Sequence, residues 1–336
     1  MFLFIQNAFS AGPSGKEGFD AGQMILHHIY DSHEWHVFDW KGKSYSIPLP
    51  IIIFHEEKGL DLFMSTKFNH GKSVYNNYKL DHGKIVFIGD GGQVDNIQTS
   101  MIWDFSITKN VFSLLFSILI LLSIFITISK RYKNQKNQPP KGIQSLLEPI
   151  IIFVRDDIAK SAIGEKHYEK YLSFLLTVFF FIFLNNLLGL VPFFPGGANL
   201  TGNIAVPMVL ASLVFIITTL SGTKYYWKHI FAMPGVPKPV LLILTPIEII
   251  GVLLKPLVLM IRLFANITAG HIIILSFFSM IFIFGEMHPA AGYGVSVFSG
   301  LFVLFMMTLE LLVAFLQAYV FTLLAAMYFG AALEEH

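Results

Sequence analysis

Four ionisable side chains lie in an otherwise apolar stretch between residues 240 and 284, namely Glu248, Lys255, Arg262 and His271. An arginine keeps its proton in proteins, so it cannot become neutral when it leaves water. Placing it near the centre of a bilayer costs about 2.5–3.5 kcal/mol or more. Apolar residues continue far on both sides of Arg262. They favour a functional charge on an ion or substrate path over an arginine that reaches back to the lipid headgroups.

The charged residues of this stretch follow a regular spacing. Glu248, Lys255 and Arg262 are seven residues apart, so they share one side of a helix, and Asn266 extends this stripe by one turn. Each polar residue alone could serve only to hydrogen-bond a neighbouring helix. The register with a second segment makes the joint interpretation stronger.

The last apolar segment carries Glu310 and Gln317, again seven residues apart. If the two segments form an antiparallel pair, Arg262 opposite Gln317 and His271 opposite Glu310 both require a turn near residue 290. The sequence at 288–292 contains Pro and Gly and supplies one. Titratable groups then lie on both sides of a fixed positive charge. This arrangement suits two half-channels separated by an electrostatic barrier rather than one continuous pore.

The composition indicates a membrane protein. Of 336 residues, 54% are hydrophobic and only 13% are charged, whereas soluble domains carry roughly 25% charge. There is no cysteine, which excludes disulfides, thiolate metal sites and cysteine nucleophiles. No basic patch interleaved with aromatic residues suggests nucleic-acid binding.

The predicted fold is an all-α polytopic membrane protein with about five membrane segments and a small N-terminal extramembrane region. The last two segments are each about 40 residues long and would reach ~60 Å as straight helices, against ~30 Å of hydrocarbon. They must therefore tilt strongly, kink or break. We expect an N-terminal region at 1–105, a first transmembrane helix at 106–130, a basic and amphipathic segment at 131–170, two further transmembrane helices at 171–221, a basic loop at 222–239 and a long tilted helical hairpin at 240–332.

The N-terminal region has a different composition. Residues 13–105 hold eight of the 23 basic and 12 of the 22 acidic residues. Residues 45–54 and 84–88 favour strands, and Asp81, His82 and Gly83 predict a turn before the second of these. The region holds none of the polar residues singled out above, so we expect it to be dispensable for ion transfer. The apolar residues at its start fit either a cleaved signal peptide or an ordinary N-terminus.

The same region is rich in histidine, which raises the question of a metal site. The spacings match no standard zinc pattern, and the sequence from His33 to His36 is not the helical HExxH motif. We therefore expect solvated histidines, no metal and no cofactor. The histidines concerned are His27, His28, His33, His36, His55, His70 and His82.

The distribution of Lys and Arg predicts the orientation in the membrane. Segments 130–170 and 222–239 contain 12 of these residues, whereas the alternate loops at 191–203 and 285–294 contain none. The positive-inside rule places the first pair in the cytoplasm. Residues 1–105 then lie outside, and the C-terminus lies inside.

Three stretches carry a resemblance to a known family, namely residues 259–271 (LMIRLFANITAGH), Glu310 with residues 316–321 (LQAYVF), and residues 186–192 (NLLGLVP). They resemble subunit a of the F-type ATP synthase of bacteria, and the resemblance covers roughly residues 107–336. Ala265 stands where glycine is usual in the family, and the N-terminal region is longer than in many members. The order of His271 and Glu310 is one of two found there.

The resemblance implies a role for each of these residues. Arg262 would face a ring of c subunits and keep each passing carboxylate ionised. His271 and Glu310 would relay protons from the outer side. Asn186 would line the entry there, and Glu248 would lie toward the cytoplasmic exit. Asn266 and Gln317 would be partners near the arginine.

The resemblance also implies partners and a location. The partners are the c-ring, subunit b of the peripheral stalk, other ATP synthase subunits and membrane lipid. The chain would bind no nucleotide itself, because the catalytic ATP sites belong to other subunits. It would be a multi-pass protein of the bacterial inner membrane.

Two other classes stay open on the residues alone. A secondary ion-coupled transporter would also place charges in the middle of the membrane, but no internal repeat or paired broken helices are evident. A membrane-embedded hydrolase needs a nucleophile or a metal set, and neither HExxH nor GxSxG is present.

Overall fold

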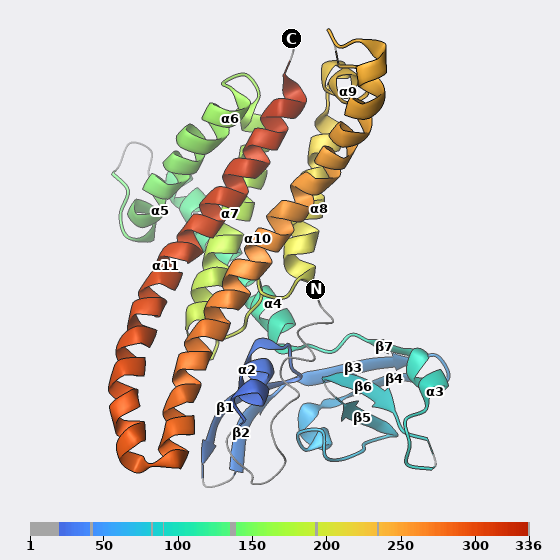
Figure 1. The fold of residues 1–336 in the computed structure, drawn as a ribbon, viewed down its shortest axis with the longest axis vertical. Coiled ribbons are helices and arrows are strands. Elements are labelled where there is room, and N and C mark those ends of the chain that lie inside the picture. The colour runs from blue at the N-terminus through green and yellow to red at the C-terminus, as the bar shows by residue number, and fades with distance from the viewer. Residues whose placement is uncertain are drawn as a thin grey trace.

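A computed structural model describes residues 20–40, 43–81, 83–89, 91–134, 139–191, 194–233 and 235–334. A long bundle of helices stands on a smaller N-terminal region that contains the strands (Figure 1). The apolar residues at the start of the chain lie outside the described residues. The two parts differ in how they build their cores, so each is taken in turn.

The N-terminal region consists of short antiparallel sheets. β1 pairs with β2, β5 pairs with β6, and β3 lies between β4 and β7. The predicted strands at 45–54 and 84–88 are confirmed, as is the turn before the second one, where Gly83 has φ of +80°. The elements are α2 (Ala21–Ile29), β1 (Glu34–Trp40), β2 (Lys43–Pro48), β3 (Pro50–His55), β4 (Gly59–Met64), η1 (Ser65–Phe68), β5 (Tyr78–Asp81), β6 (Lys84–Phe87), α3 (Asn96–Ser100) and β7 (Ile102–Asp104).

Alternation along β3 creates the core of this region. Ile51 and Ile53 point to one side of the sheet and are fully buried against Phe68 and Tyr78. A strand places every second side chain on the same face, so the β-branched residues at these two positions form one apolar surface. Burial, with a smaller contribution from the nearby Asp61, raises the pKa of Tyr78 to about 12.

The expectation of solvated histidines is wrong at two positions. His55, the last residue of β3, is fully buried, and His33 is 4% exposed beside Asp104, at 3.4 Å from its carboxylate. Burial alone would raise the pKa of Asp104, but hydrogen bonds from His33 and Ser106 outweigh it and leave the pKa below its ordinary value. His70 is partly exposed and lies 2.6 Å from Glu34. The side chains of the other four histidines lie outside the described part.

The helical part has the membrane segments that the sequence predicts. Among the described residues, four helices are long and apolar enough to cross a membrane. The 17-residue α8 is followed by α9 at an angle of 104°, and together they give the fifth segment. The helices are α4 (Lys109–Asn134), α7 (Tyr168–Leu190), α8 (Ala205–Ser221), α9 (Lys224–Phe231), α10 (Lys238–Met287) and α11 (Pro289–Leu333).

A further helical segment packs against the bundle from the side. It runs through α5 (Ile143–Phe153), the π-helix η2 (Val154–Lys160) and α6 (Ser161–Ile163). Its apolar side, including Ile158, is buried against α7 and α11. At Gly330 of α11 an added Cβ would collide with the backbone oxygen of Ala162, so the close approach of these helices depends on the missing side chain.

The predicted hairpin is confirmed, with its turn at His288. The ring Nδ1 of His288 accepts a hydrogen bond from the backbone N–H of Ala290 at 3.2 Å, and Pro289 occupies the first position of α11. Both features are favourable at a helix N-terminus. α10 continues through Pro246 and Pro256 without ending. The two helices pack along each other as a long antiparallel pair (Figure 1).

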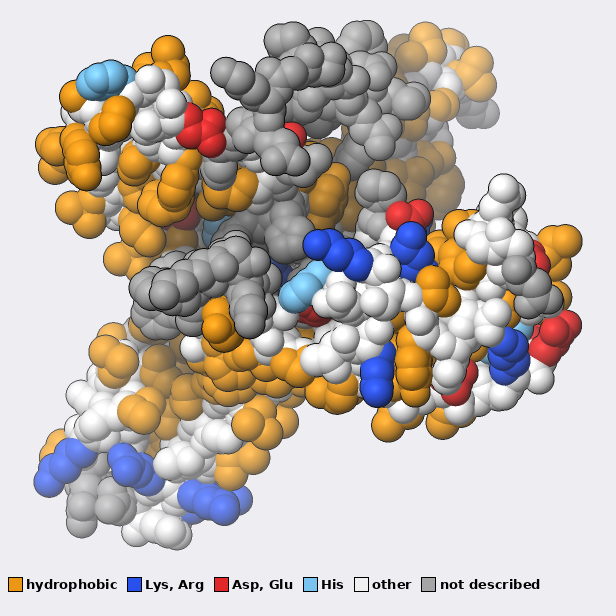
Figure 2. Space-filling view, turned by 90° about the horizontal axis from the view of Figure 1, so that it is seen from below, with side chains coloured by type: hydrophobic (Ala, Val, Ile, Leu, Met, Phe, Trp, Pro, Cys, Tyr) orange, Lys and Arg blue, Asp and Glu red, His pale blue; other side chains and the backbone are white. Residues whose placement is uncertain are grey.

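The loops divide between the two ends of the bundle. The N-terminal region, the connection between α7 and α8, and the turn at His288 lie at one end, called here the strand end (Figure 1). The C-terminus and α9 lie at the other, called the C-terminal end. Seen from the strand end, polar and charged side chains interleave with apolar ones over the N-terminal region, as expected for a region in water (Figure 2).

Candidate functional site

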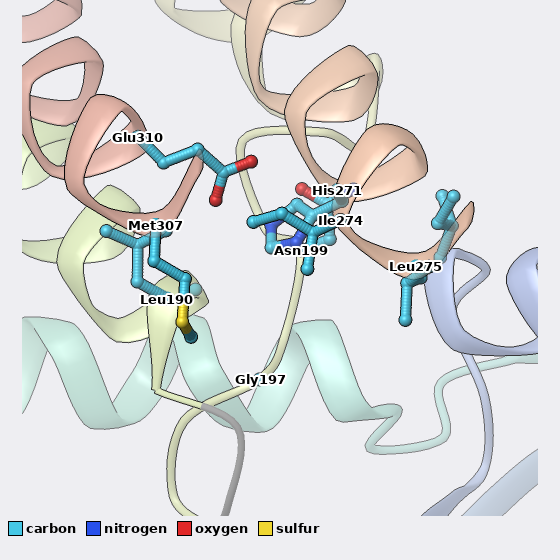
Figure 3. A pocket seen from close by; sticks show the side chains of 10 residues that line it. Leu190, Gly197, Asn199, His271, Ile274, Leu275, Met307 and Glu310 are labelled. Atoms are coloured by element: carbon cyan, nitrogen blue, oxygen red, sulfur yellow. The ribbon is translucent and has the colours of Figure 1, made fainter. Parts of the chain in front are cut away.

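The hairpin brings together His271 of α10 and Glu310 of α11, the pair that the register placed opposite each other. Both line a cavity of about 100 Å³ near the strand end, together with Asn199 from the connection between α7 and α8. Glu310 extends from α11 toward His271 and Asn199 on the opposite side of the cavity (Figure 3). An imidazole, a carboxylate and an amide thus share one small space.

The side-chain polar atoms of Glu310 and Asn199 in this cavity are available for solvent or ions. Both carboxylate oxygens of Glu310 and both polar side-chain atoms of Asn199 are buried and have no hydrogen-bond partner among the described residues. A buried polar atom without a partner costs about 1–3 kcal/mol. A water molecule needs only about 10–15 Å³ of such space. The cavity therefore suits a short chain of water molecules along which a proton can move.

Two glycines set the dimensions of the cavity. At Gly270 of α10 an added Cβ would collide with the Glu310 carboxylate, so α11 can bring this side chain close only because residue 270 has none. At Gly189 of α7 an added Cβ would meet the backbone oxygen of Ala198 at 3.5 Å and the Nε2 of His271 at 3.6 Å, which are ordinary contacts. A side chain at residue 270 would thus require the Glu310 carboxylate to move, whereas one at residue 189 would meet only ordinary contacts.

A smaller adjoining cavity of about 10 Å³ contains two more of the predicted residues, Asn186 and Asn266, and shares His271 and Glu310 with the first. The Asn186 side chain is held from two sides. Its Nδ2 donates to the backbone oxygen of Ala314 at 3.3 Å, and its Oδ1 accepts from the hydroxyl of Thr201 at 2.8 Å. These bonds tie α7, the following connection and α11 together around the path.

Arg262 lies in a different setting, on the open face of the hairpin. Its side chain is exposed, as is that of Asn266 one turn further along α10. In the described part of the chain it forms no salt bridge. Large apolar residues at neighbouring positions of α10 and in α11 are also exposed, by about 40 to 55%, among them Leu257, Val258, Ile261, Leu311, Leu312 and Leu316.

The expected pairing of Arg262 with Gln317 is not formed. Gln317 is only 7% exposed, whereas Arg262 is exposed, and no hydrogen bond joins them in the described residues. The register correctly placed both residues at neighbouring levels of the two helices. It did not determine the direction in which each side chain points, because a helical residue can turn toward or away from its partner within the same level.

Toward the C-terminal end, a second group of polar residues follows. Lys255, Tyr226 and Tyr328 line a cavity of about 10 Å³, and the Lys255 Nζ lies 5.6 Å from the centre of the Tyr328 ring. Glu248 is half-buried on α10, within electrostatic reach of the Tyr226 hydroxyl. Polar groups therefore continue along α10 on both sides of Arg262. The sequence did not single out Tyr226, Tyr328, Asn199 or Gly270 as site residues.

The fold and these cavities define a polytopic membrane protein with small polar cavities along a helical hairpin, which also carries an exposed arginine. The model of the family described as ATP synthase A chain matches residues 111–330. The chain belongs to this family. A second match, to a domain of unknown function (DUF8433), covers residues 24–105.

Curated relatives agree with this assignment. The chain is 42% identical over 240 residues to "ATP synthase subunit a" of Chloroherpeton thalassium, covering 70% of this chain and 69% of the relative. It is 45% identical over 245 residues to the protein of that name from Pelodictyon phaeoclathratiforme, covering 69% and 68%. With "ATP synthase subunit a 2" of Chlorobium luteolum it is 36% identical over 328 residues, covering 96% and 79%. This last similarity includes the N-terminal region.

Proposed function

We propose that this chain is the ion-translocating stator subunit of a rotary ATP synthase, with two offset half-channels separated by Arg262. The observation that carries the proposal is the position of Arg262 on an open, apolar face of the hairpin. A permanent charge there would face lipid at a cost of about 2.5–3.5 kcal/mol or more. A partner that presents carboxylates in the membrane removes that cost.

A ring of c subunits, each with one carboxylate, would be such a partner. As the ring turns, each carboxylate would pass Arg262, whose charge favours the ionised form of the carboxylate. A carboxylate that passes in this form carries no proton directly from one half-channel to the other. The exposed leucines and isoleucines beside Arg262 would supply the apolar contact with the ring, on which the seal against leakage depends.

The two groups of polar residues would form the two half-channels. The cavities with His271, Glu310, Asn186 and Asn199 would deliver protons from the strand end. Glu248, with the cavity around Lys255, would connect the ring to the C-terminal end. The distribution of Lys and Arg assigns the strand end to the outer side of the membrane and the C-terminal end to the cytoplasm.

Purification of the chain through an affinity tag tests the assignment. We expect the tagged chain to bring with it a ring of small membrane subunits, the peripheral stalk and the ATP-hydrolysing subunits. Ion transport by the purified chain alone, without those partners, would instead support the secondary transporter.

The orientation has its own test. Protease added to spheroplasts should cut the N-terminal region, whereas protease added to inverted membrane vesicles should leave it intact. The opposite pattern would reverse the assignment of the two half-channels to the two sides of the membrane.

A further inference from the structure

The N-terminal region reaches the cavity that contains His271 and Glu310. Ile29, the last residue of α2, is half-buried and lines this cavity together with Asn199 and Leu275. α2 packs against α10, and it lies beside Leu275 at the edge of the cavity (Figure 3). The wall at this end is therefore built partly by the N-terminal region and not by the membrane helices alone.

The segment after α2 is fixed to the start of the first membrane helix. The Oδ1 of Asp31 accepts a hydrogen bond from the backbone N–H of Asn110 at 3.0 Å. The backbone oxygen of Ser32 accepts one from the N–H of Lys109 at 2.9 Å. N–H groups in the first turn of a helix have no partner within the helix. These bonds supply partners for two such groups of α4 and hold the segment after α2 in place.

An aromatic contact fixes the same segment to the connection between α7 and α8. The ring of Trp35 packs edge-on against Phe112 of α4 and Phe194 of the connection, with centroids 5.7 and 5.2 Å away. Trp35 is only 4% exposed. Residues 29–35 thus contact α4, the cavity and the connection that carries Asn199, so Ile29 has a defined position.

We propose that Ile29, at the end of α2, forms the outer mouth of the proton path, so that the N-terminal region, which the sequence alone predicted to be dispensable for ion transfer, shapes the entry to His271 and Glu310. This inference rests on the proposed function, in which that cavity belongs to the outer half-channel. The mouth would combine an apolar side chain, Ile29, with the buried amide of Asn199. A narrow apolar mouth limits passage to a thin file of water, which conducts protons while restricting larger hydrated ions.

The absence of cysteine from this chain gives a direct test. The assembled complex with Ile29→Cys would be purified and treated with a methanethiosulfonate that carries a quaternary ammonium group. ATP-driven proton pumping would then be measured in proteoliposomes. During ATP-driven pumping protons leave through this mouth, and a fixed positive charge there raises the electrostatic barrier to their passage, so we expect pumping to fall about tenfold relative to the same variant untreated. The label is added after assembly, so a folding defect does not explain the loss.

The matched control is Leu26→Cys on the same helix. Leu26 is 41% exposed and does not line the cavity, so its labelling should leave pumping unchanged. The parent complex, treated in the same way, accounts for cysteines of other subunits. The inference is wrong if the Ile29→Cys variant does not react with the reagent, or if it reacts fully and pumps as before.

A third variant separates this inference from the proposed function. Glu310→Gln would be assayed beside the labelled complexes. Normal pumping by Glu310→Gln would remove the cavity from the proton path and overturn the proposed function with it. Loss of pumping in Glu310→Gln together with normal pumping in labelled Ile29→Cys would overturn only the role of Ile29.

Discussion

The enclosed and open sides of the α10–α11 hairpin provide different surroundings for their polar residues. Glu310 and His271 face a cavity whose walls come from α7, its following connection and α2, all within the same chain. Arg262 faces outward, among exposed leucines and isoleucines. The chain thus encloses one polar site by itself, whereas under the proposed function a partner would complete the other.

This difference determines which experiments report on which property. A change on the enclosed side alters packing, hydrogen bonding and proton transfer within the chain. Arg262 is exposed, although within electrostatic reach of Tyr328, so we expect a change there to disturb the packing of the chain less than a change on the enclosed side. Loss of function there reports mainly on the contact with a partner.

Replacing Arg262 should produce the largest effect. We expect Arg262→Ala to abolish coupled ATP synthesis and ATP-driven proton pumping while the complex still assembles. Without the cation, the passing carboxylate takes up a proton more readily and crosses without net coupled transport. Arg262→Lys should also fail or nearly fail, since lysine lacks the planar fork and loses its proton when desolvated.

Pumping and passive proton leak in vesicles with matched amounts of complex measure both variants. An arginine that merely reaches the lipid headgroups would be replaced by lysine without loss, because only a long stem and a charge are needed. Near-normal coupled pumping by Arg262→Ala would contradict the proposal that this residue is the barrier between the half-channels.

The second prediction concerns the enclosed side. Glu310→Gln should slow proton pumping at least about tenfold, because an amide preserves size and hydrogen bonding but cannot take up and release a proton. Assembly should be little affected, since glutamine fits the same cavity. Pumping rates normalised to the amount of assembled complex provide the measurement, and an unchanged rate would exclude Glu310 from the path.

Part of this comparison could be read from the sequence. The hairpin, its turn and the common cavity of His271 and Glu310 follow from helical spacing, which depends only on separation along the chain. The strands at 45–54 follow from a local concentration of β-branched and aromatic residues. Such patterns depend only on nearby residues in the sequence, and the structure contains the helices and strands that they predict.

The rest depended on packing between distant segments. Asn199 lies in a connection without periodicity, and its place in the cavity results from how α7 and α8 meet α10. The need for glycine at position 270 follows from the approach of Glu310, 40 positions away in the sequence. The burial of His33 requires Asp104 from the opposite end of the N-terminal region. The direction of Arg262, away from Gln317, was likewise invisible in the register.

Two glycines on the enclosed side allow a test in which only the size of a side chain changes. Gly270→Ala adds a methyl group that collides with the Glu310 carboxylate, whereas Gly189→Ala meets only ordinary contacts. Overpacking of this kind costs about 1–3 kcal/mol, so we expect Gly270→Ala to lower pumping several-fold by displacing Glu310. Gly189→Ala should pump nearly normally. Equal pumping rates for the two variants would show that the hairpin adjusts to a methyl group at residue 270. The close approach of Glu310 to this residue would then not be needed for pumping.

The smallest effect is expected at Asp104. Its carboxyl group has its partners within this chain and lies outside the proposed proton path. Asp104 receives hydrogen bonds from His33 and Ser106, and its pKa is below the ordinary value of 3.8 despite burial. A carboxyl whose folded-state pKa is depressed stabilises the fold above its unfolded pKa, and this contribution is lost as the pH falls through the folded pKa. Asp104→Asn keeps an acceptor oxygen but removes the charge.

Hydrogen exchange of the β3 and β7 amides in the purified complex measures this contribution. At neutral pH these amides should exchange slightly faster in Asp104→Asn than in the parent, and the difference should shrink as the pH is lowered below 3.8. Proton pumping at neutral pH should stay the same, because Asp104 and His33 bind each other away from the hairpin. A loss of pumping comparable to that of Glu310→Gln would contradict this prediction, because it would show that Asp104 contributes to proton transport and not only to the stability of the N-terminal region.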